Sequence, residues 1–168
     1  MYYYLTDRPY VLSNQAPLVQ NIYPMIGSSI STSQAIHLCR DYGLMELANK
    51  ITQNPDQYRS WTFDGVSGLP DHLMGLLGHG FEITYQCALP HDLAYGYGTI
   101  GDSKARREAD KVFREALRTK AGVSTGKAYL CWTAVRILGS GRLGLSFTWG
   151  FADKTRKSLS DTPLTITF

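Results

Sequence analysis

A histidine and a tyrosine four residues apart, with an aspartate one helix later, constrain how the middle of this chain can fold. The segment Cys87–Tyr95 reads CALPHDLAY, and Ala109–Phe113, further along, reads ADKVF. Residues four apart lie on one face of a helix, so His91 and Tyr95 are neighbours if this segment is helical. Asp110 falls on the next predicted helix, and an antiparallel return of that helix would bring its carboxylate to the imidazole. The sequence therefore predicts two consecutive helices packed side by side.

These side chains are chemically complementary. A histidine that a buried carboxylate orients is a general base, so His91 and Asp110 form a candidate dyad. Asp92 points about a quarter-turn away from His91 on the same helix and is free to bind another group. A carboxylate with carbonyl oxygens nearby is a ligand set for a hard cation such as Ca²⁺. We therefore expect proton-transfer chemistry and a cation site to lie next to each other.

The apolar periodicity predicts a mainly α fold. Three hydroxyl residues at 31–33 can cap a first helix that runs to about Thr52, and Gly43 is a candidate break within it. Pro90 lacks a backbone N–H, so the helix that carries His91 is expected to kink or restart there. We expect the later helices over three ranges: Glu82–Gly96, Ser103–Ala121 and Thr125–Leu138.

The two ends of the chain differ in pattern from this helical middle. Residues 1–30 contain three prolines and are expected to form an extended arm or short strands. In residues 142–168 apolar and polar residues alternate on both sides of the polar stretch Asp153–Pro163, which predicts a C-terminal β-hairpin. The alternating apolar positions are Leu143, Leu145, Phe147, Trp149, Phe151, Leu164, Ile166 and Phe168. The favoured interpretation is that the hairpin packs on the helical core; the alternative is a surface for a lipid interface, a protein partner or an oligomer.

Composition restricts the class of protein. At 168 residues, with 43% hydrophobic and 18% charged residues, the chain suits one globular domain, with residues 31–139 as its helical core. The net charge of +3 is modest, which favours mild attraction to anionic lipid over nucleic-acid binding. No run has membrane-spanning length, and residues 1–7 do not read as a signal peptide. We therefore expect synthesis in the cytoplasm without a signal peptide, and delivery by a non-classical route if the protein acts outside the cell.

Three cysteines, Cys39, Cys87 and Cys131, are too few for a disulfide scaffold. No two are close in sequence, so a zinc knuckle is not expected. One disulfide remains open as an alternative, but three buried thiols in a reducing compartment is the favoured interpretation.

The motifs resemble those of the secreted-type, calcium-dependent phospholipases A2. In that family one helix carries a His-Asp pair followed by a tyrosine, and an antiparallel helix carries the orienting aspartate. The segment Trp61-Thr62-Phe63-Asp64-Gly65 looks like the calcium loop of the prokaryotic and fungal branch, and Thr125–Gly139 is similar to its last helix. Ala109–Phe113 looks like the Ala-Asp-x-x-Phe element of parvoviral capsid phospholipases. The resemblance covers Trp61–Gly139, about half of the chain, and lacks the family's disulfides.

The resemblance implies a phospholipase A2-like core of antiparallel helices with a calcium loop. It implies hydrolysis of the sn-2 ester of glycerophospholipids to lysophospholipid and free fatty acid at a membrane surface. His91 would be the general base, Asp110 would orient it and Tyr95 would hold Asp110. Asp92, Asp64 and the Gly65 carbonyl would hold Ca²⁺.

Two alternatives remain open around this resemblance. The glycine-rich segment at residues 60–81 is either the metal loop or a plain connector.

Weak extracellular-type calcium sites need roughly 10⁻⁴ to 10⁻³ M calcium. We therefore expect a lipase that is delivered to calcium-rich surroundings, such as a toxin, effector or virion-associated domain. The other interpretation is a non-catalytic module that keeps the helical core and binds lipid or a protein partner.

Overall fold

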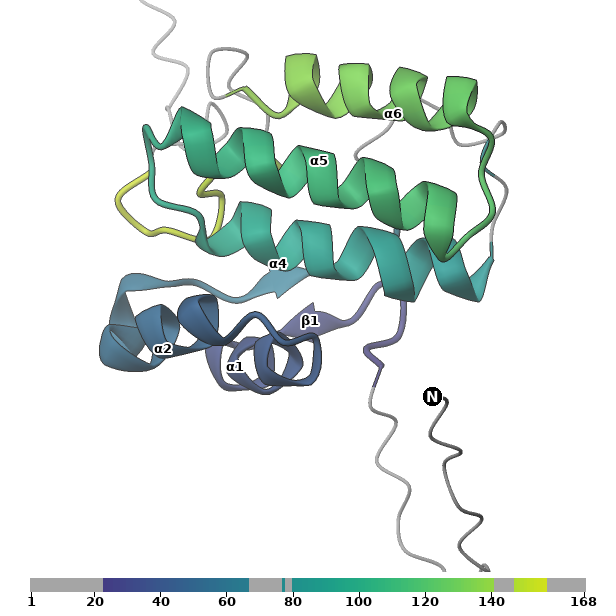
Figure 1. The fold of residues 1–168 in the computed structure, drawn as a ribbon. Helices are drawn as coiled ribbons and strands as arrows, with labels where there is room; N and C mark the ends of the chain where they lie inside the picture. Colours follow the sequence, from purple (N-terminus) through teal and green to yellow (C-terminus); the bar gives the residue numbers. More distant parts are fainter. Residues whose placement is uncertain (1–22, 67–76, 78–79, 141–146, 157–168) are drawn as a thin grey trace, which may run out of the picture.

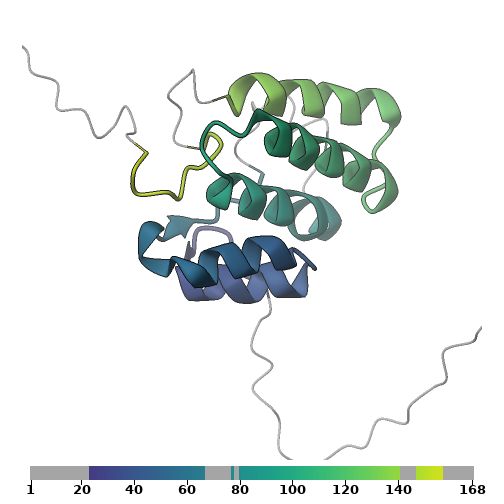
Figure 2. The same ribbon diagram turned by 60° about the vertical axis from the view of Figure 1, so that its left-hand side comes forward.

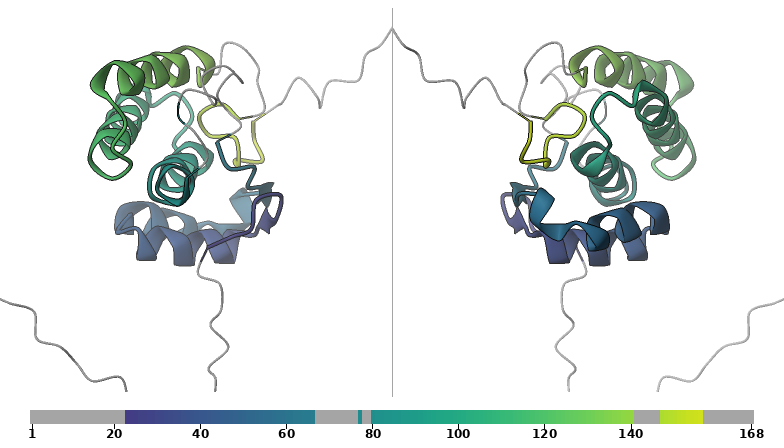
Figure 3. Two further views of the ribbon diagram at one scale, coloured as in Figure 1. Left: turned by 90° about the vertical axis from the view of Figure 1, so that its right-hand side faces the viewer. Right: turned by 90° about the vertical axis from the view of Figure 1, so that its left-hand side faces the viewer.

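A computed structural model describes residues 23–66, 77, 80–140 and 147–156, and in these the protein is mainly helical with a small two-stranded antiparallel sheet (Figure 1). The first layer contains β1 (Ser29–Ile30), α1 (Thr32–Asp41), α2 (Met45–Gln53), the 3₁₀ turn η1 (Pro55–Gln57) and β2 (Trp61–Thr62). The second contains the π-helix η2 (Glu82–Ala88), α4 (Leu89–Tyr97), α5 (Ser103–Thr119) and α6 (Thr125–Leu138). Helices α4, α5 and α6 lie side by side, and α1 and α2 cover the opposite side of α4 (Figures 2 and 3).

The first predicted helix is present but divided. Ser31 forms a capping box with Gln34 at the start of α1, which satisfies backbone N–H groups that the first turn leaves without partners. The chain then turns at Gly43, whose φ of +72° lies in the left-handed region that glycine adopts without a Cβ clash. The predicted interruption at this glycine is confirmed, and α2 continues to Gln53.

The predicted irregularity before His91 takes the form of a π-helix. The Leu89 N–H donates to the Thr84 carbonyl, five residues earlier, where η2 passes into α4. Pro90 has no N–H to donate to Tyr85 in the same register. The Tyr42 hydroxyl donates to the Tyr85 carbonyl instead, at 2.5 Å, so α1 and η2 are joined at this point.

The core consists of two clusters that meet at α4. Leu89, Leu93 and Tyr97, spaced four apart, are buried against α1, α2 and β1. The second cluster lies between η2, α5 and α6 and includes Cys87 and Cys131. One face of α4 packs into the first cluster. The other face, with His91 and Tyr95, is therefore directed to α5. All three cysteines are buried free thiols.

The prediction of a C-terminal hairpin strand is wrong at residues 147–151, which form turns. Gly150 has a φ of +79°, which an extended strand does not contain, and its N–H donates to the Tyr95 carbonyl at 2.7 Å. The Trp149 indole donates to the Thr99 carbonyl at 2.7 Å. The segment therefore folds back onto the end of α4. Residues 142–146 and 157–168 of the predicted hairpin, and residues 1–22 of the predicted arm, lie outside the described residues. Within the rest of the arm, Ser29–Ile30 form the short strand β1.

Within the described ranges, no helix is both long enough and apolar enough to cross a membrane. Most of the glycine-rich segment, residues 67–76 and 78–79, lies outside those ranges.

Candidate functional site

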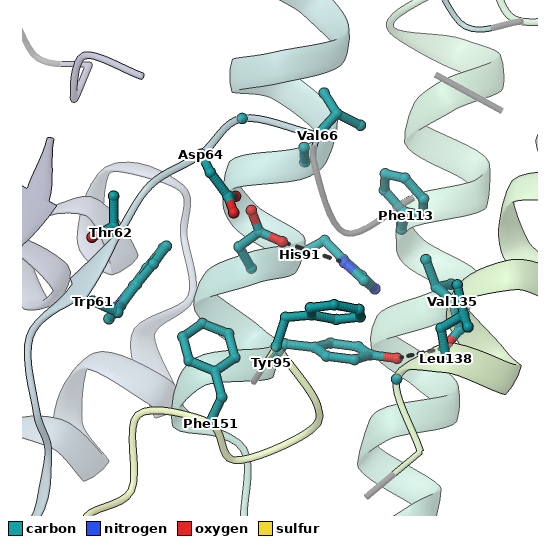
Figure 4. Close-up of a pocket in the computed structure, with 15 residues that line it drawn as sticks. Trp61, Thr62, Asp64, Val66, His91, Tyr95, Phe113, Val135, Leu138 and Phe151 are labelled. Atoms are coloured by element: carbon teal, nitrogen blue, oxygen red, sulfur yellow. Dashed lines mark hydrogen bonds and ion pairs between the residues drawn. The ribbon is translucent and has the colours of Figure 1, made fainter. Parts of the chain in front are cut away.

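A cavity of about 310 Å³ opens beside α4, and Figure 4 shows the residues around it. The loop after β2 supplies Asp64, Gly65 and Val66, and α4 supplies His91, Asp92 and Tyr95. The remaining lining residues are mainly apolar: Trp61, Thr62, Ala88, Phe113, Val135, Leu138, Gly139, Phe147 and Phe151. The segments predicted to carry the dyad and the metal loop thus border one cavity.

The contact predicted between His91 and Asp110 is present. The imidazole Nε2 lies 3.0 Å from Asp110 Oδ1, because α5 returns alongside α4. The hydroxyl of Tyr95 donates to the same oxygen at 2.6 Å. Asp110 is completely buried, and the His91 side chain is only 8% exposed. His91 therefore separates this carboxylate from the cavity.

Two aromatic rings hold the imidazole in this orientation. Its centroid lies 4.3 Å from that of Tyr95 and 4.6 Å from that of Phe113. Phe113 is on α5, close to Asp110 in sequence, and is itself buried. Packing on both rings restricts rotation of the imidazole, so the hydrogen bond to Asp110 is supported by shape as well as by charge.

Arg136, near the end of α6, binds the second carboxylate oxygen of Asp110. Its Nη1 donates to Oδ2 at 2.6 Å, so the carboxylate, which is on α5, contacts side chains from both α4 and α6. Burial alone would raise the pKa of Asp110. The hydrogen bonds from His91, Tyr95 and Arg136 outweigh burial and lower that pKa. The pKa of His91 is raised, because its contacts with Asp110 and Asp92 outweigh its burial.

The other side of the imidazole has a different electrostatic environment. His91 Nδ1 lies 3.9 Å from Asp92 Oδ1, which is an ion-pair distance and too long for a hydrogen bond. Burial raises the pKa of Asp92 to about 6; His91 opposes the shift, and the charge of Asp64 adds to it. Asp64 approaches the cavity from the loop after β2 (Figure 4), and Asp92, next to His91 on α4, also lines it. Two like-charged carboxylates therefore face one partly enclosed space.

The donor set suits a hard cation. Carboxylate oxygens from Asp64 and Asp92 are ligands of the type that Ca²⁺ prefers, and Gly65 lines the same cavity in a turn with a φ of +79°. No group of three or more His, Cys, Asp or Glu side chains suited to a metal occurs in the described part of the chain. A bound Ca²⁺ would thus take its other ligands from main-chain carbonyl oxygens and water.

Comparison with protein families matches residues 49–135 to the family described as "Protein of unknown function (DUF1353)". The match spans just over half of the 168 residues. The chain belongs to the DUF1353 family. No curated protein and no solved structure matches it.

The DUF1353 match contains β2, η2, α4 and α5, and with them every site residue that the sequence predicts. Three residues that the sequence analysis missed lie after it: Arg136, Phe147 and Phe151. Arg136 in the last turn of a helix is typical of an ordinary C-terminal charge, so nothing in the sequence pointed to Asp110. Phe147 and Phe151 belonged to an alternating pattern that predicted a strand, and the turn at Gly150 brings them to the cavity instead.

Proposed function

We propose that this DUF1353 protein is a calcium-dependent phospholipase A2 that releases the sn-2 fatty acid from glycerophospholipids. The observation that supports this most strongly is the joint position of two features at one cavity. The buried carboxylate of Asp110 orients the imidazole of His91 on one side, and the carboxylates of Asp64 and Asp92 lie on the other. A hydrolase that uses an activated water and a cation needs both features within reach of one ester.

The hydrogen bond to Asp110 determines which imidazole nitrogen can act as the base. An ionised carboxylate only accepts, so Nε2 of His91 carries the proton in the 3.0 Å contact with Oδ1. Nδ1 is then free to accept a proton from a water molecule in the cavity. That water attacks the ester carbonyl, and His91 later returns the proton to the departing lysophospholipid oxygen. Asp110 stabilises the imidazolium while it lasts, and Tyr95 holds the carboxylate still.

The cation and the apolar lining have separate roles in this proposal. Ca²⁺ held by Asp64, Asp92 and the Gly65 carbonyl would stabilise negative charge on the ester oxygen and the lipid phosphate. Phe113, Val135 and Phe151 give the cavity an apolar wall that can accept part of an acyl chain. The natural target is then a phospholipid membrane surface, reached in calcium-rich surroundings after delivery as a toxin, effector or virion-associated domain.

Fatty-acid release from mixed phospholipid vesicles tests this function. Wild type, His91→Ala and His37→Ala are compared with millimolar calcium and with excess EGTA. His37 is exposed on α1 and does not line the cavity, so it is a matched control for loss of a histidine. We expect calcium-dependent release by wild type and His37→Ala and its loss in His91→Ala.

Either of two results would contradict the proposal. Release that persists in His91→Ala would exclude this histidine as the base. A folded wild-type protein that binds vesicles but releases no fatty acid from any lipid would favour the non-catalytic lipid- or protein-binding module.

A further inference from the structure

The two oxygens of Asp110 have different partners. Oδ1 accepts from His91 at 3.0 Å and from Tyr95 at 2.6 Å, and both donors are neutral when the imidazole is ready to act as a base. Oδ2 accepts from Arg136 at 2.6 Å. The Arg136 side chain is 19% exposed and Asp110 is fully buried, so this ion pair is largely removed from water. A permanent positive charge therefore lies directly behind the dyad.

A buried carboxylate needs such a charge. Neutral hydrogen bonds alone compensate poorly for the loss of water around an ionised group, and an uncompensated carboxyl becomes protonated instead. A guanidinium stays charged at any pH at which the protein works. If Asp110 were protonated or rotated, Nε2 of His91 would lose its acceptor. The imidazole proton could then move to either nitrogen.

The main chain of Arg136 is also fixed. Arg106 on α5 donates from Nη1 to the Arg136 carbonyl at 3.1 Å, which attaches the last turn of α6 to the helix that carries Asp110. The position of the guanidinium relative to Asp110 is therefore set through both its side chain and its backbone.

We propose that Arg136 is a positioning residue of this site: it keeps Asp110 ionised and correctly oriented, so that His91 holds its proton on Nε2 and offers Nδ1 to the cavity. The effect on the rate rests on the proposed function. The effect on the imidazole does not, because it is a property of the unliganded protein.

The test uses Arg136→Gln, Arg136→Lys and the control Arg118→Gln in the full chain. Glutamine can still donate a hydrogen bond but carries no charge, and lysine keeps the charge. Arg118 pairs with Glu115 on the exposed face of α5, outside the network. Nitrogen-15 NMR of the histidine rings, recorded over a pH series that extends above the raised pKa of His91, reports which nitrogen of the neutral imidazole is protonated. A His91→Ala sample assigns its signals. Lipid hydrolysis, measured as kcat and KM, is the second readout.

In wild type, Arg118→Gln and Arg136→Lys we expect the Nε2-protonated form of His91. In Arg136→Gln we expect a mixture of tautomers, or fast exchange of the Nε2 proton. The kcat of that variant should fall by about tenfold or more with KM little changed, since a general base contributes about 10²- to 10⁴-fold. A merely structural role would lower thermal stability without changing the tautomer.

Three results would overturn the proposal. The first is a folded Arg136→Gln with the wild-type imidazole signals, and the second is a wild type without the Nε2-protonated form. If Arg136→Gln does not fold, Arg136→Lys is the deciding variant. The third result is then a folded Arg136→Lys in which His91 has lost the Nε2-protonated form. The changed tautomer in Arg136→Gln, seen in a protein that hydrolyses no lipid, would support the role of Arg136 and contradict only the phospholipase activity.

Discussion

Asp110 and the pair Asp64 and Asp92 lie on opposite sides of one imidazole, and their environments are opposite in sign. Asp110 is fully buried and accepts from three side chains, and its pKa is lowered. Asp92 lines a cavity beside another carboxylate, and its pKa is raised to about 6. The protein supplies its own positive charge on the first side and brings two negative charges together on the second.

The difference indicates what each side is suited for. A carboxylate saturated with donors stabilises the fold and holds a neighbouring group still. Paired carboxylates in a cavity cost free energy unless a cation joins them, and such costs are typical of binding sites. Under the proposed function, the first side orients the base, and the second is the place for an external cation.

The largest loss of stability is expected from Asp110→Asn, which changes the carboxylate on the first side of His91. The substitution removes the charge that compensates Arg136, and breaking a buried ion pair costs about 3–5 kcal/mol of unfolding free energy. Urea denaturation measures this cost. Glu108→Gln is the control on the same helix, because the ion pair of Glu108 with Lys111 is exposed and its loss should change stability little. Equal stability of the two variants would show that Asp110 is not a structural charge.

The difference in stability between wild type and Asp110→Asn should depend on pH in a definite direction. The pKa of Asp110 is lower in the folded state than in the unfolded state, so the folded state binds fewer protons. Its contribution to stability is complete above the unfolded pKa of about 3.9 and is lost as the pH falls through the lower folded value. The gap between wild type and Asp110→Asn should therefore narrow below about pH 4. A difference in unfolding free energy between the two proteins that grows on acidification would contradict a lowered pKa of Asp110.

The next effect concerns packing behind Asp110. A Cβ added at Gly139 would lie 2.5 Å from the Tyr95 ring and hydroxyl and 2.6 Å from the Val135 carbonyl oxygen, so Gly139→Ala must displace the tyrosine that holds Asp110 and the backbone at the end of α6. Overpacking of this kind costs about 1–3 kcal/mol. Gly126→Ala on the same helix meets open space and should be neutral or stabilising by up to about 1 kcal/mol. Thermal unfolding of both variants measures the contrast, and equal effects would mean that Tyr95 can move freely.

The sequence predicts the Asp110 side of the site well, because that side depends on regular helices. The spacing of His91 and Tyr95 specifies a shared face once α4 forms, and a short connection from α4 to α5 brings Asp110 back to that face. Arg136 could not be predicted, since its partner depends on how α6 packs on α5. Helical periodicity indicates which face is buried, but not which buried carboxylate a basic side chain reaches.

The cavity side was harder to predict because loops form much of it. The alternation of Phe147, Trp149 and Phe151 satisfies a strand pattern, yet the backbone turns at Gly150. Close packing explains this outcome. The Trp149 ring occupies the space where a side chain at Gly98 would lie, and a Cβ at Gly96 would come within 3.1 Å of the Phe151 ring. Two glycines at the end of α4 thus leave space for aromatic side chains of the loop. A single sequence does not reveal such contacts, because they depend on the tertiary structure.

The smallest expected effect is the response of stability to calcium, and it compares the two sides directly. Calcium at ten times its Kd would stabilise wild type by about 1.4 kcal/mol, since only the folded state brings Asp64 and Asp92 together. For a chain of this length that corresponds to a rise in Tm of about 3–6 °C. Asp92→Asn should abolish the rise, whereas Asp56→Asn, which changes an exposed carboxylate outside the cavity, should keep it.

The same melting curves without calcium complete the comparison. Asp92→Asn should then leave the Tm unchanged or raise it, because it removes one of two like charges, whereas Asp110→Asn lowers it. An equal calcium response in Asp92→Asn and Asp56→Asn would exclude Asp92 as a ligand. A calcium-free Asp92→Asn as unstable as Asp110→Asn would show that both sides of His91 serve the fold. The distinction between an orienting carboxylate and a cation-binding pair would then be wrong.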